Sequence, residues 1–123
     1  MAATPGRELQ VFKAEFFKAL AHPIRIRLLE VLRHGERSVQ ELQGALELDQ
    51  STVSQQLAVL RAKHVVTARK EGTTVRYAVR DARVGDLLDV ARAIFNAQLA
   101  GTQTMLRELK KEGRRAARGG SRA

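Results

Sequence analysis

Residues 48–61 read LDQSTVSQQLAVLR, and this stretch determines the fold that the sequence predicts. Asp49 to Ser51 can cap a helix that runs to about Lys63. At helical spacing its buried face carries Val53, Leu57 and Leu60, and its opposite face carries Ser51, Gln55, Ala58 and Ala62. A small, polar face without long charged side chains suits insertion into a groove. An ordinary amphipathic surface helix is the alternative.

A short basic hairpin is predicted directly after this helix. Residues 65–69 (VVTAR) are rich in β-branched side chains, and residues 74–79 (TVRYAV) alternate between apolar and polar. Residues 70–73 (KEGT) form a glycine-containing turn between the two strands. Residues 61–83 hold seven basic and two acidic side chains, which is typical of a surface that meets a polyanion.

A helix-turn-helix followed by a basic hairpin is typical of a protein that reads duplex DNA. The helix enters the major groove and the hairpin follows the backbone beside it. Glutamine can bond the edge of adenine, and hydroxyl and cationic groups can bond phosphates. The candidate DNA contacts are Gln50, Ser51, Thr52, Ser54, Gln55, Gln56, Arg61, Arg69, Lys70, Thr73, Thr74 and Arg76.

Three further helices are predicted upstream of residue 48. The first spans residues 8–20, and the second begins at Pro23 and stops at His34-Gly35. Ser38 and Glu41 form a capping box that starts a short third helix. The expected fold class is therefore mainly α with a small β-hairpin (α+β), a winged helix-turn-helix with a long C-terminal dimerisation helix.

The long C-terminal helix is expected to run from Val84 to about Glu112, with Gly101 as a tolerated interruption. At about 1.5 Å per residue it would be roughly 40 Å long, more than one small domain can cover. Its apolar positions recur every three or four residues, which favours pairing with a second copy. The candidate dimer interface is Phe12, Phe16, Val84, Leu88, Ala91, Phe95, Gln98 and Met105. The alternative is a helix folded back on its own core.

The length of 123 residues fits one domain. We expect a flexible arm over residues 1–7, the DNA-binding and dimerisation domain over 8–112, and a basic, disordered tail over 113–123. The net charge is +9, and residues 110–123 hold six basic side chains and one acidic one. That segment either binds a polyanion or keeps the protein in solution. Without a signal-like or membrane-spanning apolar run, we expect a cytoplasmic protein with no membrane partner.

Two longer motifs resemble a known family of bacterial repressors. ALAHPIRIRLL at residues 19–29 resembles the start of the second helix of ArsR-type winged-helix regulators, and residues 48–61 resemble their recognition helix. The resemblance continues through residues 65–66, 69–72 and 75–77 and covers roughly residues 8–100. It implies a homodimeric transcriptional regulator that binds double-stranded DNA at a palindromic operator and usually represses.

The effector of such a regulator stays open. Many members of the family sense metals through cysteine, and this chain contains none. Of the three histidines, His22 is expected to cap a helix, His34 to contact a helix end, and His64 to pack or to touch a phosphate. No cofactor is expected, and a nickel or zinc site of nitrogen and oxygen ligands is a lesser alternative.

Other classes of function fit the sequence less well. An enzyme is not expected, because the sequence holds no glycine-rich phosphate loop, no cysteine nucleophile and no strand-turn-helix serine motif. A dimeric protein-interaction module without specific DNA binding is one alternative. A general nucleoid or RNA binder acting through the basic tail is another.

Overall fold

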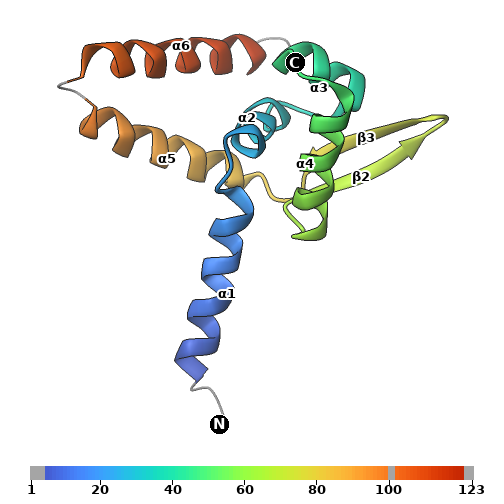
Figure 1. Cartoon of the computed structure of the whole chain (residues 1–123), viewed down its shortest axis with the longest axis horizontal. Helices are drawn as coiled ribbons and strands as arrows, with labels where there is room; N and C mark the ends of the chain where they lie inside the picture. Colours follow the sequence, from blue (N-terminus) through green and yellow to red (C-terminus); the bar gives the residue numbers. More distant parts are fainter. Residues whose placement is uncertain (1–4, 100–101, 121–123) are drawn as a thin grey trace.

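The computed structural model describes residues 5–99 and 102–120. Its elements, in chain order, are α1 (Pro5–Leu20), α2 (Pro23–Leu32), β1 (Arg37–Ser38), α3 (Val39–Leu46), α4 (Gln50–Ala62), β2 (Val66–Glu71), β3 (Thr74–Val79), α5 (Arg83–Gln98) and α6 (Gln103–Gly120). Helix α1 and the β2–β3 hairpin project in different directions from a body that contains α2, α3 and α4 (Figure 1). The predicted winged helix-turn-helix, mainly helical with a small sheet, is confirmed.

The hydrophobic core fixes α4 in place. Leu28 and Leu29 of α2, Leu42 of α3, and Leu57 and Leu60 of α4 are fully buried. Burial of a leucine side chain stabilises a fold by about 1.5–3 kcal/mol, so these contacts hold the three helices as one unit. The opposite side of α4 is left for function.

Local signals in the sequence set the helix starts as predicted. The Nδ1 atom of His22 accepts a hydrogen bond of 3.1 Å from the backbone N–H of Ile24, so His22 caps α2. Ser38 and Glu41 form the reciprocal capping box of α3, with bonds of 3.2 and 2.9 Å. Asp49 caps α4. These caps satisfy backbone donors that have no partner within the first turn of a helix.

The sheet has three strands in the order β1-β3-β2, all antiparallel. The pair Glu71↔Thr74 closes the hairpin, so the turn holds only Gly72 and Thr73 and β2 is longer than predicted. Gly72 has a φ of 63°, which glycine adopts without strain. Strand β1 was not predicted, because two residues are too few to show a periodic pattern.

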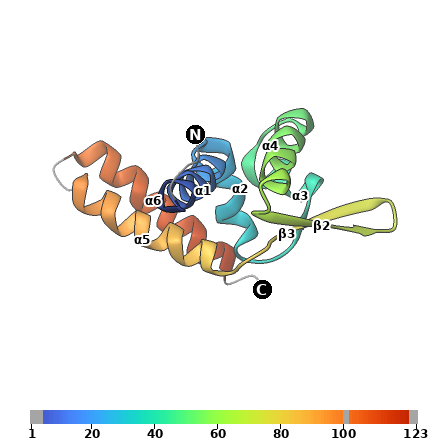
Figure 2. The ribbon, with the colours of Figure 1, turned by 90° about the horizontal axis from the view of Figure 1, so that it is seen from below.

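The prediction of a single long C-terminal helix over residues 84–112 is wrong. Helix α5 ends at Gln98, and α6 returns antiparallel beside it, as both views of the ribbon show (Figures 1 and 2). Glycine costs a helix about 1 kcal/mol relative to alanine, and Gly101 falls in the interval between the two helices. The return also half-buries Leu106, Leu109 and Ala116.

The ends of the chain also differ from the prediction. The boundary expected at residue 112 falls inside α6, and residues 113–120 are helical rather than disordered. Packing of α6 against α2 and α5 supplies the contacts that local sequence cannot show. Residues 5–7 belong to α1 instead of a flexible arm. The remaining parts of the predicted arm and tail, residues 1–4 and 121–123, lie outside the described residues. No helix in the described part of the chain is long and apolar enough to cross a membrane.

Candidate nucleic-acid interface

The outer face of α4 is polar and lies in the open. Gln50, Ser51, Gln55 and Arg61 are exposed, whereas Ser54 is half-buried. Val53, which is fully buried, fixes the rotation of the helix. The helix therefore presents amide and hydroxyl groups together, with a guanidinium at its C-terminal end. This is the pattern that base-edge and phosphate contacts require.

Two of the predicted contacts on α4 already have partners inside the protein. The Oε1 atom of Gln56 accepts a hydrogen bond of 3.0 Å from Nη1 of Arg25. Arg25 also donates to the backbone oxygens of Ala19, at 2.8 Å, and Lys18, at 3.1 Å, at the C-terminal end of α1. The hydroxyl of Thr52 donates to the capping carboxylate of Asp49 at 2.5 Å. Gln56 and Thr52 therefore support the position of α4.

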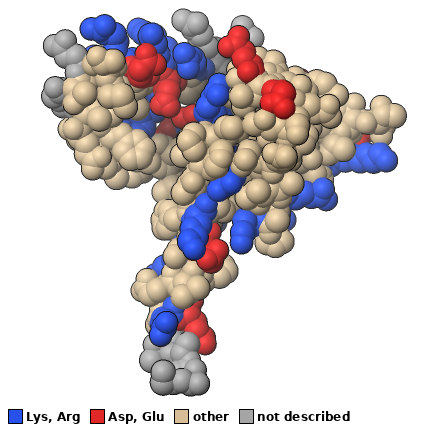
Figure 3. Space-filling model, viewed as in Figure 1, with Lys and Arg blue, Asp and Glu red and all other residues tan. Residues whose placement is uncertain are grey.

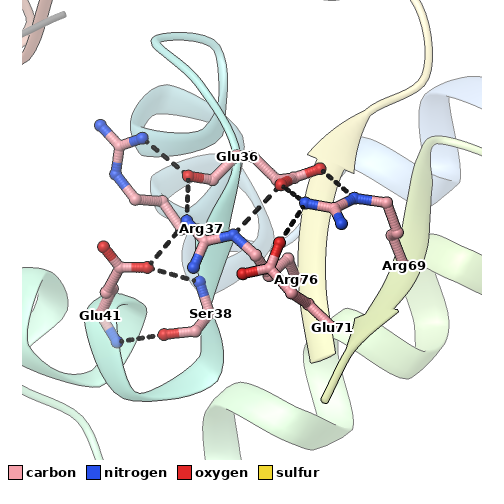
Figure 4. A network of polar contacts seen from close by, with 7 residues as sticks. All are labelled: Glu36, Arg37, Ser38, Glu41, Arg69, Glu71 and Arg76. Carbon is pink, nitrogen blue, oxygen red and sulfur yellow. Dashed lines mark hydrogen bonds and ion pairs between the residues drawn. The ribbon is translucent and has the colours of Figure 1, made fainter. Parts of the chain in front are cut away.

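Glu36 joins the hairpin to the body of the protein (Figure 4). Its Oε1 atom accepts from Nη2 of Arg69 at 2.5 Å and from Nε of Arg76 at 3.1 Å. Arg76 also approaches Oε1 of Glu41 at 3.3 Å, and Arg69 approaches Oε2 of Glu71 at 2.9 Å. The hydrogen bond from Arg69 in particular lowers the pKa of Glu36, so this carboxyl stays ionised near neutral pH. Together with the backbone pairing of β1 and β3, these ion pairs link the hairpin to the body.

The role expected of the hairpin arginines therefore needs refinement. Arg69 and Arg76 were predicted to contact phosphates, and both already pair with carboxylates. Lys70 and Thr73 lie exposed near the turn, and Thr74 is half-buried beside them. Figure 3 shows basic side chains along the projecting hairpin. Lys70 is the hairpin cation that the structure leaves most available to a phosphate.

Arg25, Glu36 and Glu41 were not among the predicted site residues. Arg25 bonds Gln56, which is 31 positions away in the sequence, and Glu36 bonds Arg76, which is 40 positions away. No spacing rule links such pairs before the fold is known. The capping box was the only local signal, and it identified Glu41 as part of the cap of α3 rather than as a partner of Arg76.

The predicted dimer residues divide into several groups. Phe12 of α1 and Phe95 of α5 are 74% and 50% exposed, although both are large and apolar. Phe16 is 39% exposed, and Leu88, Ala91 and Gln98 lie on α5 with partial or full exposure. The prediction that Val84 lies in the dimer interface is corrected, because this side chain is buried in the core of its own protomer at 8% exposure. Met105 lies on α6 and is 51% exposed, so its place in a dimer interface stays a prediction.

Helix α6 combines a few half-buried side chains with many exposed charges. Its half-buried residues include Leu106, Leu109 and Ala116, while the basic side chains are exposed. Figure 3 shows blue side chains above this helix. The exposed basic residues are Arg107, Lys110, Lys111, Arg114 and Arg115.

Across the described residues, no group of three or more histidine, aspartate or glutamate side chains is placed to hold a metal ion. His22 acts as the predicted helix cap. His34 follows the end of α2 as expected, and its backbone N–H donates to the oxygen of Val31 at 3.2 Å. His64 adopts a φ of 62° between α4 and the hairpin, and its side chain is exposed.

Comparison with known proteins gives a consistent family assignment. Residues 22–67 match the family described as bacterial regulatory protein, arsR family. The HTH-type transcriptional regulator Rv0081 of Mycobacterium tuberculosis is 43% identical over 106 residues, which cover 85% of this chain and 93% of the relative. A biofilm growth-associated repressor of Agrobacterium fabrum is 40% identical over 84 residues, 68% of this chain and 72% of the relative.

Solved structures extend this similarity to the fold. The crystal structure of Rv0081 has a TM-score of 0.68 and 44% identity, and the match covers 80% of this chain and 97% of that one. The solution structure of the homodimeric winged helix-turn-helix domain of Mb0332 from Mycobacterium bovis also has a TM-score of 0.68. Its identity is 31%, over 80% of this chain and 94% of that one.

Proposed function

The chain belongs to the ArsR family of bacterial regulatory proteins, and we propose on that basis that it represses transcription as a homodimer on a palindromic operator. One observation carries this proposal. The open polar face of α4 lies next to a projecting hairpin whose Arg69 and Arg76 bond Glu36. A recognition helix and a positioned wing are the two parts that a winged-helix protein uses on duplex DNA.

We assign different roles to the polar residues of this surface. Gln55 is the best placed to read a base, because it is exposed and lies opposite the buried Val53. Ser51 and Arg61, near the two ends of α4, and Lys70 on the hairpin would contact phosphates and set the register. Arg69 and Arg76 would act mainly by holding the hairpin.

The dimer would form through α1 and α5. Phe12, Phe17, Ile94 and Phe95 are each at least half exposed in the single chain. An apolar surface of this kind is a common mark of an interface, and the relative Mb0332 is described as homodimeric. A two-fold axis would place the α4 helices of both protomers about 34–36 Å apart, so that they meet successive major grooves.

DNase I footprinting of the purified protein on genomic fragments tests this proposal. The expected result is a protected site with two-fold sequence symmetry and half-sites about one helical turn apart. Sedimentation should show a dimer, and Phe95→Asp should shift it to the monomer and weaken the footprint. Even protection of every fragment, lost completely at moderate salt, would instead indicate general polyanion binding. The absence of DNA binding from a stable dimer would favour a protein-interaction module.

A further inference from the structure

A cavity of about 670 Å³ lies between α2, α3 and α6, and the proposed DNA contacts do not line it. Its walls come from one side of α2, from the C-terminal end of α3 and from the last turns of α6. Figure 1 shows α6 passing α2 and ending near α3. Pockets that bind small molecules usually measure about 300–1,000 Å³, so the size suits a metabolite.

Three guanidinium groups line this cavity, and two of them are held by backbone oxygens. Nη2 of Arg27 donates to the oxygen of Leu46 at 3.0 Å. Nη1 of Arg37 donates to the oxygen of Glu36, also at 3.0 Å. A guanidinium has five N–H donors, so each anchored group keeps donors for a ligand. The third is Arg115 of α6. Fixed guanidinium groups are suited to bind carboxylate or phosphate oxygens.

His34 lies in the same wall and holds a buried polar atom. Its Nε2 atom is buried and has no hydrogen-bond partner in the described part of the protein. Burial and the neighbouring Arg33 and Arg37 lower the pKa of His34, so the ring is neutral near pH 7. His34 therefore adds a neutral ring to the wall, and its Nε2 atom lies beneath the surface of the cavity.

The carboxylates of the cavity reduce the positive charge only in part. Glu30 of α2 and Glu112 of α6 face each other, and burial together with Glu112 raises the pKa of Glu30 to about 7. Near pH 7, Glu30 is therefore protonated in part and carries less than its full negative charge. Glu47 lies exposed at the end of α3. Three guanidinium groups thus face three carboxyl groups, of which Glu30 is partly protonated near pH 7, so the excess of positive charge is small.

We propose that this cavity binds a small organic anion with a carboxylate or phosphate group on an apolar body. Arg27, Arg37 and Arg115 would hold the anionic oxygens. The apolar part would lie against Val31, Ala45, Leu46 and Ala116, which line the same space. The site goes beyond the proposed function and does not depend on DNA binding.

Amide NMR spectra of the full chain, recorded without DNA, test the proposal. Benzoate and phenyl phosphate serve as the probes, and benzyl alcohol serves as the uncharged control. The expected result is a saturable shift of α2, α3 and α6 amides with at least one anion and none with benzyl alcohol. The anion that binds more tightly identifies the preferred acid group. The proposal is overturned if neither anion causes a saturable shift, or if benzyl alcohol binds as tightly.

A pair of neighbouring substitutions shows whether the binding uses this cavity. Arg115→Gln removes a guanidinium that lines the cavity, whereas Arg114→Gln removes one from the same helix that does not. Both side chains are exposed, so neither change should unfold the protein. Loss of one charged hydrogen bond should weaken anion binding about tenfold in Arg115→Gln, with little change in Arg114→Gln. Equal weakening in both variants would show non-specific attraction to α6 and reject the site.

Discussion

The substitution Gln55→Ala tests most directly how the protein would read DNA. Gln55 is exposed on α4, and no hydrogen bond joins its side chain to another described residue. The substitution therefore removes no contact within the protein, and stability should change by less than about 0.5 kcal/mol. A glutamine that bonds an adenine edge contributes about 1–3 kcal/mol of discrimination. The expected loss of affinity for the preferred site is then roughly 5- to 150-fold.

Gln56→Ala is the matched control, because it changes the same residue type at the next position. Gln56 is half-buried and accepts a bond of 3.0 Å from Arg25, so its loss should cost stability of about 1 kcal/mol. The affinity of the Gln56→Ala variant for DNA should fall by the same factor for all sequences. The assay is fluorescence anisotropy with the selected operator and with single-base variants of it.

The two variants give opposite patterns if the reasoning is right. Gln55→Ala should no longer prefer one base over the others at one position in each half-site. Its affinity for operator variants that carry another base at that position should not change. Binding-site selection should return a motif relaxed at that position. If Gln55→Ala selects the same motif as the unchanged protein, or if Gln56→Ala alone changes the motif, the assignment of Gln55 as the base-reading residue is wrong.

Three further substitutions examine the wing, the core and the buried carboxyl pair. Lys70→Ala should weaken binding to all sequences alike and reduce the slope of log affinity against log salt by about 1, measured by titration at several salt concentrations. A sequence-selective loss would contradict a phosphate contact. Leu57→Ala should lower the free energy of unfolding by about 3–5 kcal/mol in urea titrations, because Leu57 is fully buried; a loss under about 1 kcal/mol would show that it does not hold α4. Glu30 has a pKa raised from 4.5 to about 7, so folding takes up a proton between these pH values and the protein loses stability as the pH rises through them. Glu30→Gln should therefore stabilise the protein more above pH 7 than below pH 4.5, and an equal effect at both would contradict the raised pKa.

The sequence predicted those parts of the fold that local patterns determine. The capping box of Ser38 and Glu41, the cap at Asp49 and the buried side of α4 each depend on residues within about two turns of one another. The hairpin was predicted for the same reason, since Gly72 lies between two β-prone runs. The recognition helix and its wing could therefore be placed from the sequence alone.

Parts that depend on distant contacts could not be predicted in this way. The break between α5 and α6 reflects the packing of α6 against α2, which competes with the continuous helix that the apolar spacing favours. In the candidate site, Arg76 looked like a free cation because Glu36 is 40 positions away. The polar side chains of the candidate interface could be proposed from the sequence, and the ion-pair network around Glu36 could not.

The position of α1 links the stability of the protein to its abundance. Residues 6–18 of this helix are exposed in the single chain, so an isolated protomer keeps a large apolar area in water. Association that covers this area stabilises the folded state by mass action. Dissociation and melting would then form one coupled process, and dilution would lower the melting temperature. In a cell, the copy number would decide both how much of the regulator stays folded and how long its DNA sites remain covered.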